Sequence, residues 1–293
     1  MPSFTDQMGR TIVLERPPVR IVSLVPSQTE LLYTLGLDTP ASASVSSAPG
    51  FEVVGITKFC VHPASWFREK KRIGGTKDVR PEMIDALQPD LIIANKEEND
   101  REQVEALATR YPVWISDVKT LPDALAMIRA VGELISRPQQ ALVLAAAIEK
   151  GFSELAILHP AIPTSSPSQP APAPTPSLRT AYFIWRKPWM VAGDGTFIDD
   201  MLQRCGLTNI FGDQDRYPVV DLASLANKSC ELVLLSSEPY PFRKQHIAEI
   251  QALLPNASIR LVDGELFSWY GSRLLQAPAY FQKLLRELPG PFV

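Results

Sequence analysis

The 293-residue sequence has few cysteines, no long apolar run and no surplus of positive charge. Three cysteines (Cys60, Cys205 and Cys230) are too few and too scattered to form a disulfide framework. No stretch approaches the roughly 18 apolar residues that a membrane span needs. A net charge of −3 argues against the basic surface on which nucleic-acid binding depends. The sequence therefore predicts neither a membrane span nor a nucleic-acid partner.

The first ten residues, MPSFTDQMGR, also lack the features of a secretory signal. They contain no apolar core and no small-residue cleavage site. As encoded, the chain is expected to stay in the cytoplasm, and an odd number of cysteines suits a reducing compartment. The alternative is a periplasmic protein from which the signal has been removed.

What the sequence does contain is a regular alternation of short apolar runs with amphipathic segments. Runs of strand length lie at 20–26, 53–56, 90–94, 113–115, 180–185, 231–236 and 259–262. Helical patterns separate them, and Ser27 with Glu30 has the spacing of a capping box at a helix start. Strands that alternate with helices favour parallel sheets covered by helices, so the predicted fold class is α/β.

Length and pattern divide the chain into two α/β lobes. We expect an N-terminal lobe at 1–119, a helical connection with one long helix at 120–158, and a C-terminal lobe at 179–293. Residues 159–178 contain seven prolines in 20 positions. This composition predicts a disordered surface insertion. The alternative is a Pro-rich ligand for a partner protein.

Aromatic and charged residues follow several of the predicted strands. In open parallel sheets, ligands bind beyond the carboxyl ends of the strands, so these loops are where a site is expected. Trp185, Trp189, Trp269 and Tyr270 favour an aromatic-walled pocket for a bulky ligand, and the alternative is that they pack the core between the lobes. Arg186, between the first two of these, is expected to orient the polar rim of that ligand.

Two further loops contain patterns of known chemistry. Cys60 and His62 form a Cys-x-His pair of residue types that bind transition metals. This pair supports an alternative interpretation, a cytoplasmic metal- or cofactor-handling protein or enzyme, although an ordinary loop is the preferred one. The segment IGGTK at 73–77 lacks the spacing of a phosphate-binding loop. Its two glycines favour a tight turn.

Four segments together resemble a known family: RIVSLVPSQTELLYTLGL, VVGITKFCVHP, RPEMIDALQPDLIIAN and the long helix. They resemble the periplasmic binding proteins of iron-complex and vitamin B12 ABC transporters. The resemblance covers nearly the whole chain outside the Pro-rich insertion. It implies two Rossmann-like lobes with parallel sheets joined by a single long α-helix, as in class III periplasmic binding proteins.

The resemblance also implies a function. It implies a non-catalytic, monomeric substrate-binding protein with no cofactor of its own. The implied ligand is cobalamin or another corrinoid, haem or an iron chelate, captured in the cleft between the lobes for an ABC permease.

Several ligand contacts follow from the same resemblance. Phe59 falls on a pocket aromatic, Tyr217 near a pocket tryptophan and Glu265 near an acidic contact, whereas Asn95 stands where an aromatic is often found. The complete predicted ligand-binding set is Ser27, Lys58, Phe59, Asn95, Trp185, Arg186, Trp189, Tyr217, Glu265, Trp269 and Tyr270.

A transporter contact is implied as well. Glu82 matches a surface glutamate that docks on the permease. The second lobe has Ala223 at the matching position, and Asp221 nearby is interpreted as a helix cap, with a substitute docking carboxylate as the alternative.

Overall fold

The computed structural model describes residues 2–37, 51–158 and 177–288. Most of the Pro-rich segment, at 159–176, lies outside these residues. The chain divides into two compact units. Unit 1 comprises 1–118, 122–147 and 270–272, and unit 2 comprises 119–121, 148–269 and 273–293. The predicted helical connection is therefore shared between the two units.

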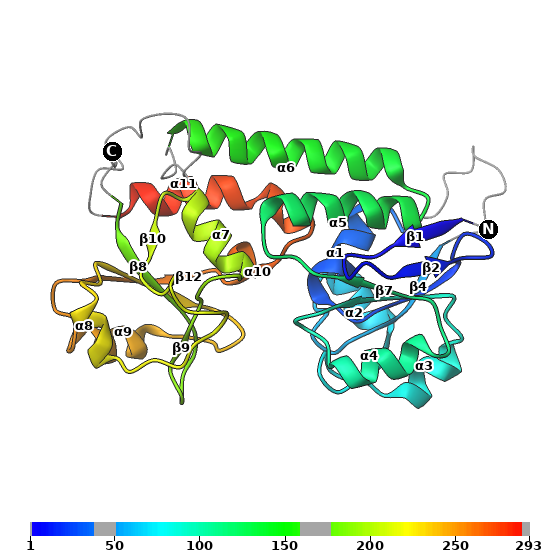
Figure 1. Ribbon diagram of the computed structural model, residues 1–293, viewed down its shortest axis with the longest axis horizontal. Coiled ribbons are helices and arrows are strands. Elements are labelled where there is room, and N and C mark those ends of the chain that lie inside the picture. Colours follow the sequence, from blue (N-terminus) through cyan, green and yellow to red (C-terminus); the bar gives the residue numbers. More distant parts are fainter. Residues whose placement is uncertain (1, 38–50, 159–176, 289–293) are drawn as a thin grey trace. The chain divides into compact units, whose positions relative to one another are not determined.

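Unit 1 is built on a five-stranded parallel sheet with the order β5-β4-β3-β6-β7. Its strands are β3 (Arg20–Ser23), β4 (Glu52–Ile56), β5 (Lys71–Arg72), β6 (Leu91–Asn95) and β7 (Val113–Ser116). Its helices are α1 (Pro26–Thr34), α2 (Ala64–Glu69), α3 (Pro81–Leu87), α4 (Arg101–Ala108) and most of α5 (Leu121–Leu134). Helix α5 lies over one face of the sheet, and α3 and α4 lie over the other (Figure 1).

In the sheet of unit 1, β3, β4, β6 and β7 are largely apolar because helices cover both faces of the sheet, whereas the short edge strand β5 is charged and exposed. Every residue of β6 and of β7 is buried. One core cluster joins alternate strand residues such as Ile92 to Ile84 of α3 and to Val104 and Leu107 of α4. Continuous apolar runs were the pattern that predicted these strands.

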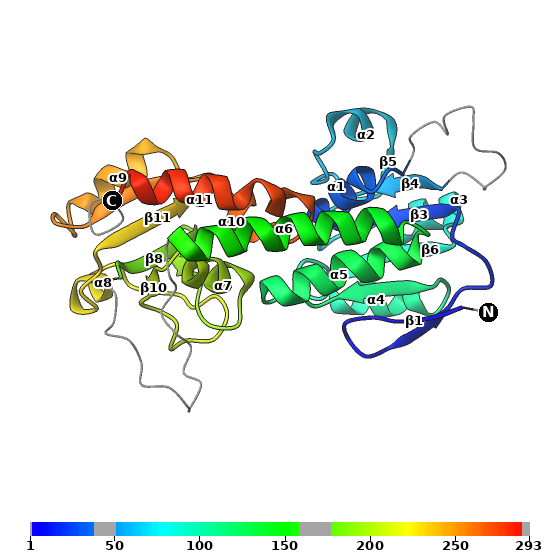
Figure 2. The same ribbon diagram turned by 90° about the horizontal axis from the view of Figure 1, so that it is seen from above.

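Unit 2 contains a second sheet, in which the parallel strands have the order β10-β8-β11-β12 and β9 pairs antiparallel with β8. Its strands are β8 (Arg179–Trp185), β9 (Met190–Val191), β10 (Thr208–Asn209), β11 (Leu232–Ser236) and β12 (Ser258–Val262). Its helices are α7 (Phe197–Arg204), α8 (Ala223–Asn227), α9 (Lys244–Gln251), α10 (Glu265–Ser268) and α11 (Ala277–Arg286). Helix α6 (Pro138–Leu158) runs beside α11 in both views and contributes residues to both units (Figures 1 and 2).

The start of α1 differs from the prediction. The helix begins at Pro26 with Val25 as its N-cap residue, and the hydroxyl of Ser27 has no hydrogen-bond partner. The predicted capping box of Ser27 and Glu30 is therefore wrong. Proline at the first helical position starts the helix two residues earlier than the capping box would, which moves Ser27 inside the first turn.

A hairpin that the sequence did not predict covers the free edge of β7. Strands β1 (Ser3–Thr5) and β2 (Thr11–Val13) pair antiparallel. The Asp6 carboxylate accepts the Ile115 N–H at 3.3 Å, the Gln7 N–H donates to the Ile115 carbonyl at 3.1 Å, and the Arg10 guanidinium donates to the Val113 carbonyl at 3.0 Å. These bonds occupy backbone groups that an open sheet edge offers to other chains.

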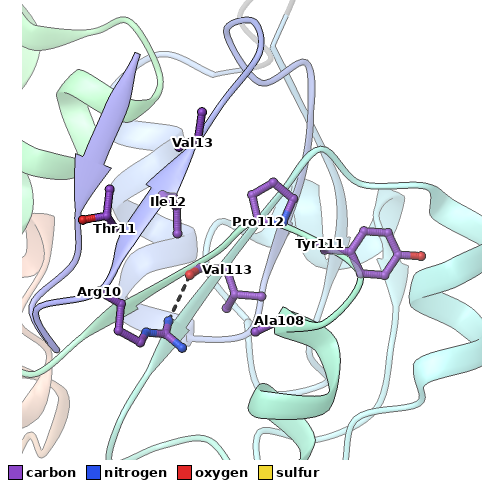
Figure 3. Close-up of a pocket in the computed structure, with 8 residues that line it drawn as sticks. All are labelled: Arg10, Thr11, Ile12, Val13, Ala108, Tyr111, Pro112 and Val113. Carbon is purple, nitrogen blue, oxygen red and sulfur yellow. Dashed lines mark hydrogen bonds between the residues drawn. The ribbon is translucent and has the colours of Figure 1, made fainter. Parts of the chain in front are cut away.

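The same hairpin borders a surface pocket of about 280 Å³. Figure 3 shows Arg10, the residue before β2, donating to the carbonyl of Val113, with Ile12, Tyr111 and Pro112 also lining the pocket. Val113 is the first residue of β7, so the pocket lies at the amino end of that strand. Ligands of parallel sheets bind at the opposite edge.

Substituting Asp6 tests the role of the hairpin. The Asp6 carboxylate is buried and also accepts from the backbone of Met8 and Arg10. Asp6→Ala leaves these N–H groups without their acceptor and is expected to lower the free energy of unfolding by about 2–4 kcal/mol in urea titration. Asp213→Ala removes an exposed ion pair with Lys228 and should change it by less than about 0.5 kcal/mol. Equal effects of the two substitutions would contradict this role.

Candidate ligand-binding site

The loops at the carboxyl edge of the sheet in unit 1 are held together by Asn99, which is 4% exposed. Its Nδ2 donates to the carbonyls of Leu24 at 3.2 Å and Thr76 at 3.0 Å, and its Oδ1 accepts the Asn95 N–H at 2.8 Å. Lys77 Nζ adds a hydrogen bond to the Asn99 carbonyl at 3.1 Å. The loops after β3, β5 and β6 are thereby fixed to one another. The sequence alone did not identify this role of Asn99, because its partners Leu24 and Thr76 are 75 and 23 residues away along the chain.

Lys58 and Phe59, at the end of β4, bring an aromatic ring and a cation to this edge. Phe59 is 50% exposed and Lys58 is exposed too. The Lys58 ammonium lies 5.1 Å from the centroid of the Phe59 ring, which is a cation–π distance. The pair presents an apolar face with a positive charge beside it.

Two other predicted contacts of unit 1, Ser27 and Asn95, lie in the interior, at 1% and 2% exposure. Asn95 Nδ2 donates to the Ser116 hydroxyl at 2.9 Å, and its Oδ1 accepts the N–H groups of Glu97 and Glu98. These bonds use the amide to shape the loop after β6. Asn95 therefore stabilises the loop after β6 from the interior and is not part of the exposed surface at this edge of the sheet.

Cys60 is fully buried between two hydroxyl groups. Its sulfur lies 3.2 Å from Thr29 Oγ1 and 3.1 Å from Thr57 Oγ1. Burial raises the pKa of the Cys60 thiol to about 11, so the thiolate that binds metals is disfavoured at neutral pH. His62 is half-buried. Among the described residues, no group of three or more His, Cys, Asp or Glu side chains has the geometry of a metal site.

In unit 2, Trp185 lies at the carboxyl end of β8 and is 39% exposed. Its ring contacts that of Tyr240 edge-on, with centroids 5.7 Å apart.

The next residue, Arg186, is half-buried and forms a bidentate ion pair with Glu249 at 3.1 and 3.0 Å. Trp189 packs against the core through Phe242 and Phe183, and the Arg186 guanidinium lies 5.4 Å from its ring centroid. Trp185 is therefore the more exposed of the two tryptophans.

The predicted aromatics Trp269 and Tyr270 are buried, at 7% and 4% exposure. The Trp269 indole N–H donates to Glu238 Oε1 at 2.8 Å, and the Tyr270 hydroxyl donates to Glu98 Oε1 at 2.9 Å. Burial raises the pKa of the Glu238 carboxyl. These hydrogen bonds explain how the polar ends of two large rings are accommodated in the interior.

The remaining predicted residues occupy surface or half-buried positions. Glu265 is half-buried and forms an ion pair with Arg273 at 2.5 Å, and Tyr217 is half-buried beside Arg216. Glu82 is exposed in the first turn of α3. The Asp221 carboxylate accepts the Ala223 N–H at 3.1 Å, but the N-cap residue of α8 is Leu222, so Asp221 lies one residue before the cap position that the sequence predicted for it.

A comparison with protein families decides the class of the molecule. The model of the periplasmic binding protein family matches residues 21–253. The chain belongs to the periplasmic binding protein family. It is accordingly a substrate-binding protein of the kind that serves ABC transporters and not an enzyme. The alternative interpretation built on Cys60 and His62 is not favoured.

Relatives and solved structures agree with this family. The vitamin B12-binding protein of Pectobacterium atrosepticum is 25% identical over 276 residues, which cover 92% of this chain and 90% of the relative. Vitamin B12 binding protein BtuF of Vibrio cholerae aligns with a TM-score of 0.70 and 21% identity over 93% of this chain and 99% of its own. Periplasmic heme-binding protein BhuT aligns at 0.71 and 18% identity over 88% and 94%. The predicted class III fold is confirmed.

Membership of this family corrects the expected location. Members and relatives are periplasmic binding proteins of importers, which points to the periplasm, so the prediction of a cytoplasmic protein was wrong. A sequence pattern in ten residues is weaker evidence on compartment than a match over most of the chain. Within the described parts of this periplasmic binding protein, no helix is long and apolar enough to cross a bilayer.

Removing the Asn99 amide tests whether it fixes the loops of unit 1. Asn99→Ala leaves the carbonyls of Leu24 and Thr76 and the N–H of Asn95 without this partner. We expect a loss of about 2–4 kcal/mol in the free energy of unfolding, because unpaired buried polar groups are costly. Asn227, exposed at the end of α8, is the matched control, and its alanine variant should be nearly neutral. An Asn99→Ala protein as stable as the wild type would contradict this role.

Proposed function

We propose that this protein binds a bulky metal complex with a flat conjugated ligand, a corrinoid such as cobalamin, and delivers it to an ABC permease. One observation carries the proposal. At the carboxyl edge of its sheet, each unit has an exposed aromatic and a cation: Phe59 lies 5.1 Å from the Lys58 ammonium, and Trp185 is followed in the chain by Arg186, whose guanidinium lies over the Trp189 ring. Relatives named for vitamin B12 support the choice of ligand.

The chemistry of these pairs matches such a ligand. Exposed aromatic rings contribute most binding free energy when they pack against a large apolar surface, and a macrocycle provides such a surface. Cations at the margin of the rings complement oxygen-rich groups at the periphery of the ligand. Arg186 is already paired with Glu249, so it offers less free charge than Lys58.

Haem is the second candidate ligand, and Lys58 is the observation that favours it. Haem carries carboxylates at the edge of its ring, and the Lys58 ammonium lies beside the Phe59 ring in an exposed loop. A carboxylate next to that ammonium forms a charge-assisted hydrogen bond. Solved structures named for haem binding share the fold.

Delivery requires a contact with the permease, for which we propose Glu82. It lies exposed in the first turn of α3. The helix is held in place by the segment that follows α4. Asp85 of α3 accepts hydrogen bonds from the Arg110 guanidinium at 2.8 and 2.6 Å and from the Tyr111 hydroxyl at 2.7 Å. A carboxylate on a fixed helix is a defined partner for a cationic surface.

Isothermal titration of the purified protein with cyanocobalamin and with haemin tests the proposal. One of the two should bind at one to one with micromolar or tighter affinity. Phe59→Ala and Trp185→Ala are each expected to weaken binding by about tenfold or more, since each removes one aromatic face.

Two exposed aliphatic residues away from these edges provide controls for the titration. Val13→Ala in β2 and Leu253→Ala after α9 should leave the affinity unchanged. Binding of neither ligand by the wild type would contradict the proposal. Equal losses in the control variants would show that the aromatic residues are not specific contacts.

A further inference from the structure

The turn between β5 and α3 passes directly beneath the Lys58–Phe59 pair. A Cβ atom added at Gly75 would lie 3.4 Å from Lys58 Cε and 3.4 Å from Phe59 Cε2. The side chains of both residues therefore rest on the backbone of Gly75. Any side chain larger than a methyl group at this position would have to share their space.

The backbone of this turn is fixed on several sides, so it is the side chains that would have to move. Gly74 has a φ of +112°, and a Cβ there would meet the Asp78 carbonyl at 2.3 Å. The Gly74 carbonyl accepts the Lys58 N–H at 2.8 Å, and the Gly75 N–H donates to the Asp78 carbonyl at 2.8 Å. Lys77 Nζ ties the turn to the Glu97 and Asn99 carbonyls.

Gly75 itself is free of conformational strain. It is not among the glycines with a positive φ, so its backbone conformation does not require glycine. The absence of a side chain therefore matters for the space above it, where Lys58 and Phe59 lie. This distinguishes Gly75 from Gly74, which the turn needs for its φ.

We propose that Gly75 is a specificity-determining positioning residue of the ligand-binding surface. By having no side chain, it lets the Lys58 ammonium and the Phe59 ring lie next to each other, 5.1 Å apart, on one surface. That surface selects ligands that combine a flat conjugated face with an anionic or oxygen-rich group at its margin. The inference rests on the proposed function, in which this surface contacts the ligand.

A graded series of substitutions tests the inference by titration with cyanocobalamin and haemin. Gly75→Ala adds a Cβ at ordinary contact distance and should change the affinity by no more than about twofold. Gly75→Val adds methyl groups that displace the Phe59 ring, and we expect about tenfold weaker binding. Gly212→Val, at an exposed glycine of unit 2, is the matched control and should leave binding unchanged.

A double-mutant cycle separates positioning from a general loss of structure. If Gly75 acts through the aromatic ring, Gly75→Val should have little further effect in the Phe59→Ala background. Additive losses in the double variant would overturn the inference. So would a Gly75→Val protein that binds as tightly as the wild type, whereas the proposed function would stand in both cases.

A ligand-independent measurement keeps the inference testable if the wild type binds neither probe. Nuclear Overhauser contacts between the Phe59 ring protons and the Gly75 α-protons are expected in the free wild-type protein. In Gly75→Val, the Phe59 ring resonances should shift and its contacts with residue 75 should change to the new methyl groups or disappear. Absence of the wild-type contact, or an unchanged Phe59 ring in the variant, would overturn the inference whatever the ligand.

Discussion

Parallel pairing of β3 with β4 on one side and β6 on the other determines what unit 1 offers to a ligand. The chain passes from β3 to β4 on one side and later returns to β6 on the other side of β3, so the loops at the carboxyl ends of these strands lead away from each other. Asn99 connects the loops after β3, β5 and β6 through its hydrogen bonds. The exposed Lys58–Phe59 pair lies on this fixed edge, so the surface proposed to receive the ligand is largely preformed.

Much of the fold followed from the sequence because buried parallel strands require uninterrupted apolar runs. The runs at 90–94 and 231–236 correspond closely to β6 and β11. The hairpin of β1 and β2 was missed because its strands have three residues each and alternate between exposed and half-buried positions. Its position depends on hydrogen bonds of Asp6 and Arg10 with β7, more than 100 residues later in the chain. No local sequence pattern indicates such contacts.

The sequence predicted the loops on which the candidate site is proposed, but not which residues of these loops are exposed. Phe59 and Trp185 follow predicted strands and reach solvent, whereas Trp269 and Tyr270 satisfy the same rule and are buried. The difference lies in acceptors distant in sequence: Glu238 is 31 residues from Trp269, and Glu98 is 172 residues from Tyr270. Likewise, the spacing of Cys60 and His62 gave no sign that two threonine hydroxyls surround the thiol.

The central claim is that the carboxyl-edge loops, and not other surfaces, receive the ligand. Hydrogen–deuterium exchange of the whole protein with and without saturating cyanocobalamin or haemin tests it most directly. The account predicts slower exchange at 57–60, 74–78 and 185–189 when the ligand that binds is present, and no change in the β1–β2 hairpin at 3–13. Protection confined to the hairpin and its pocket, with the edge loops unaffected, would contradict it.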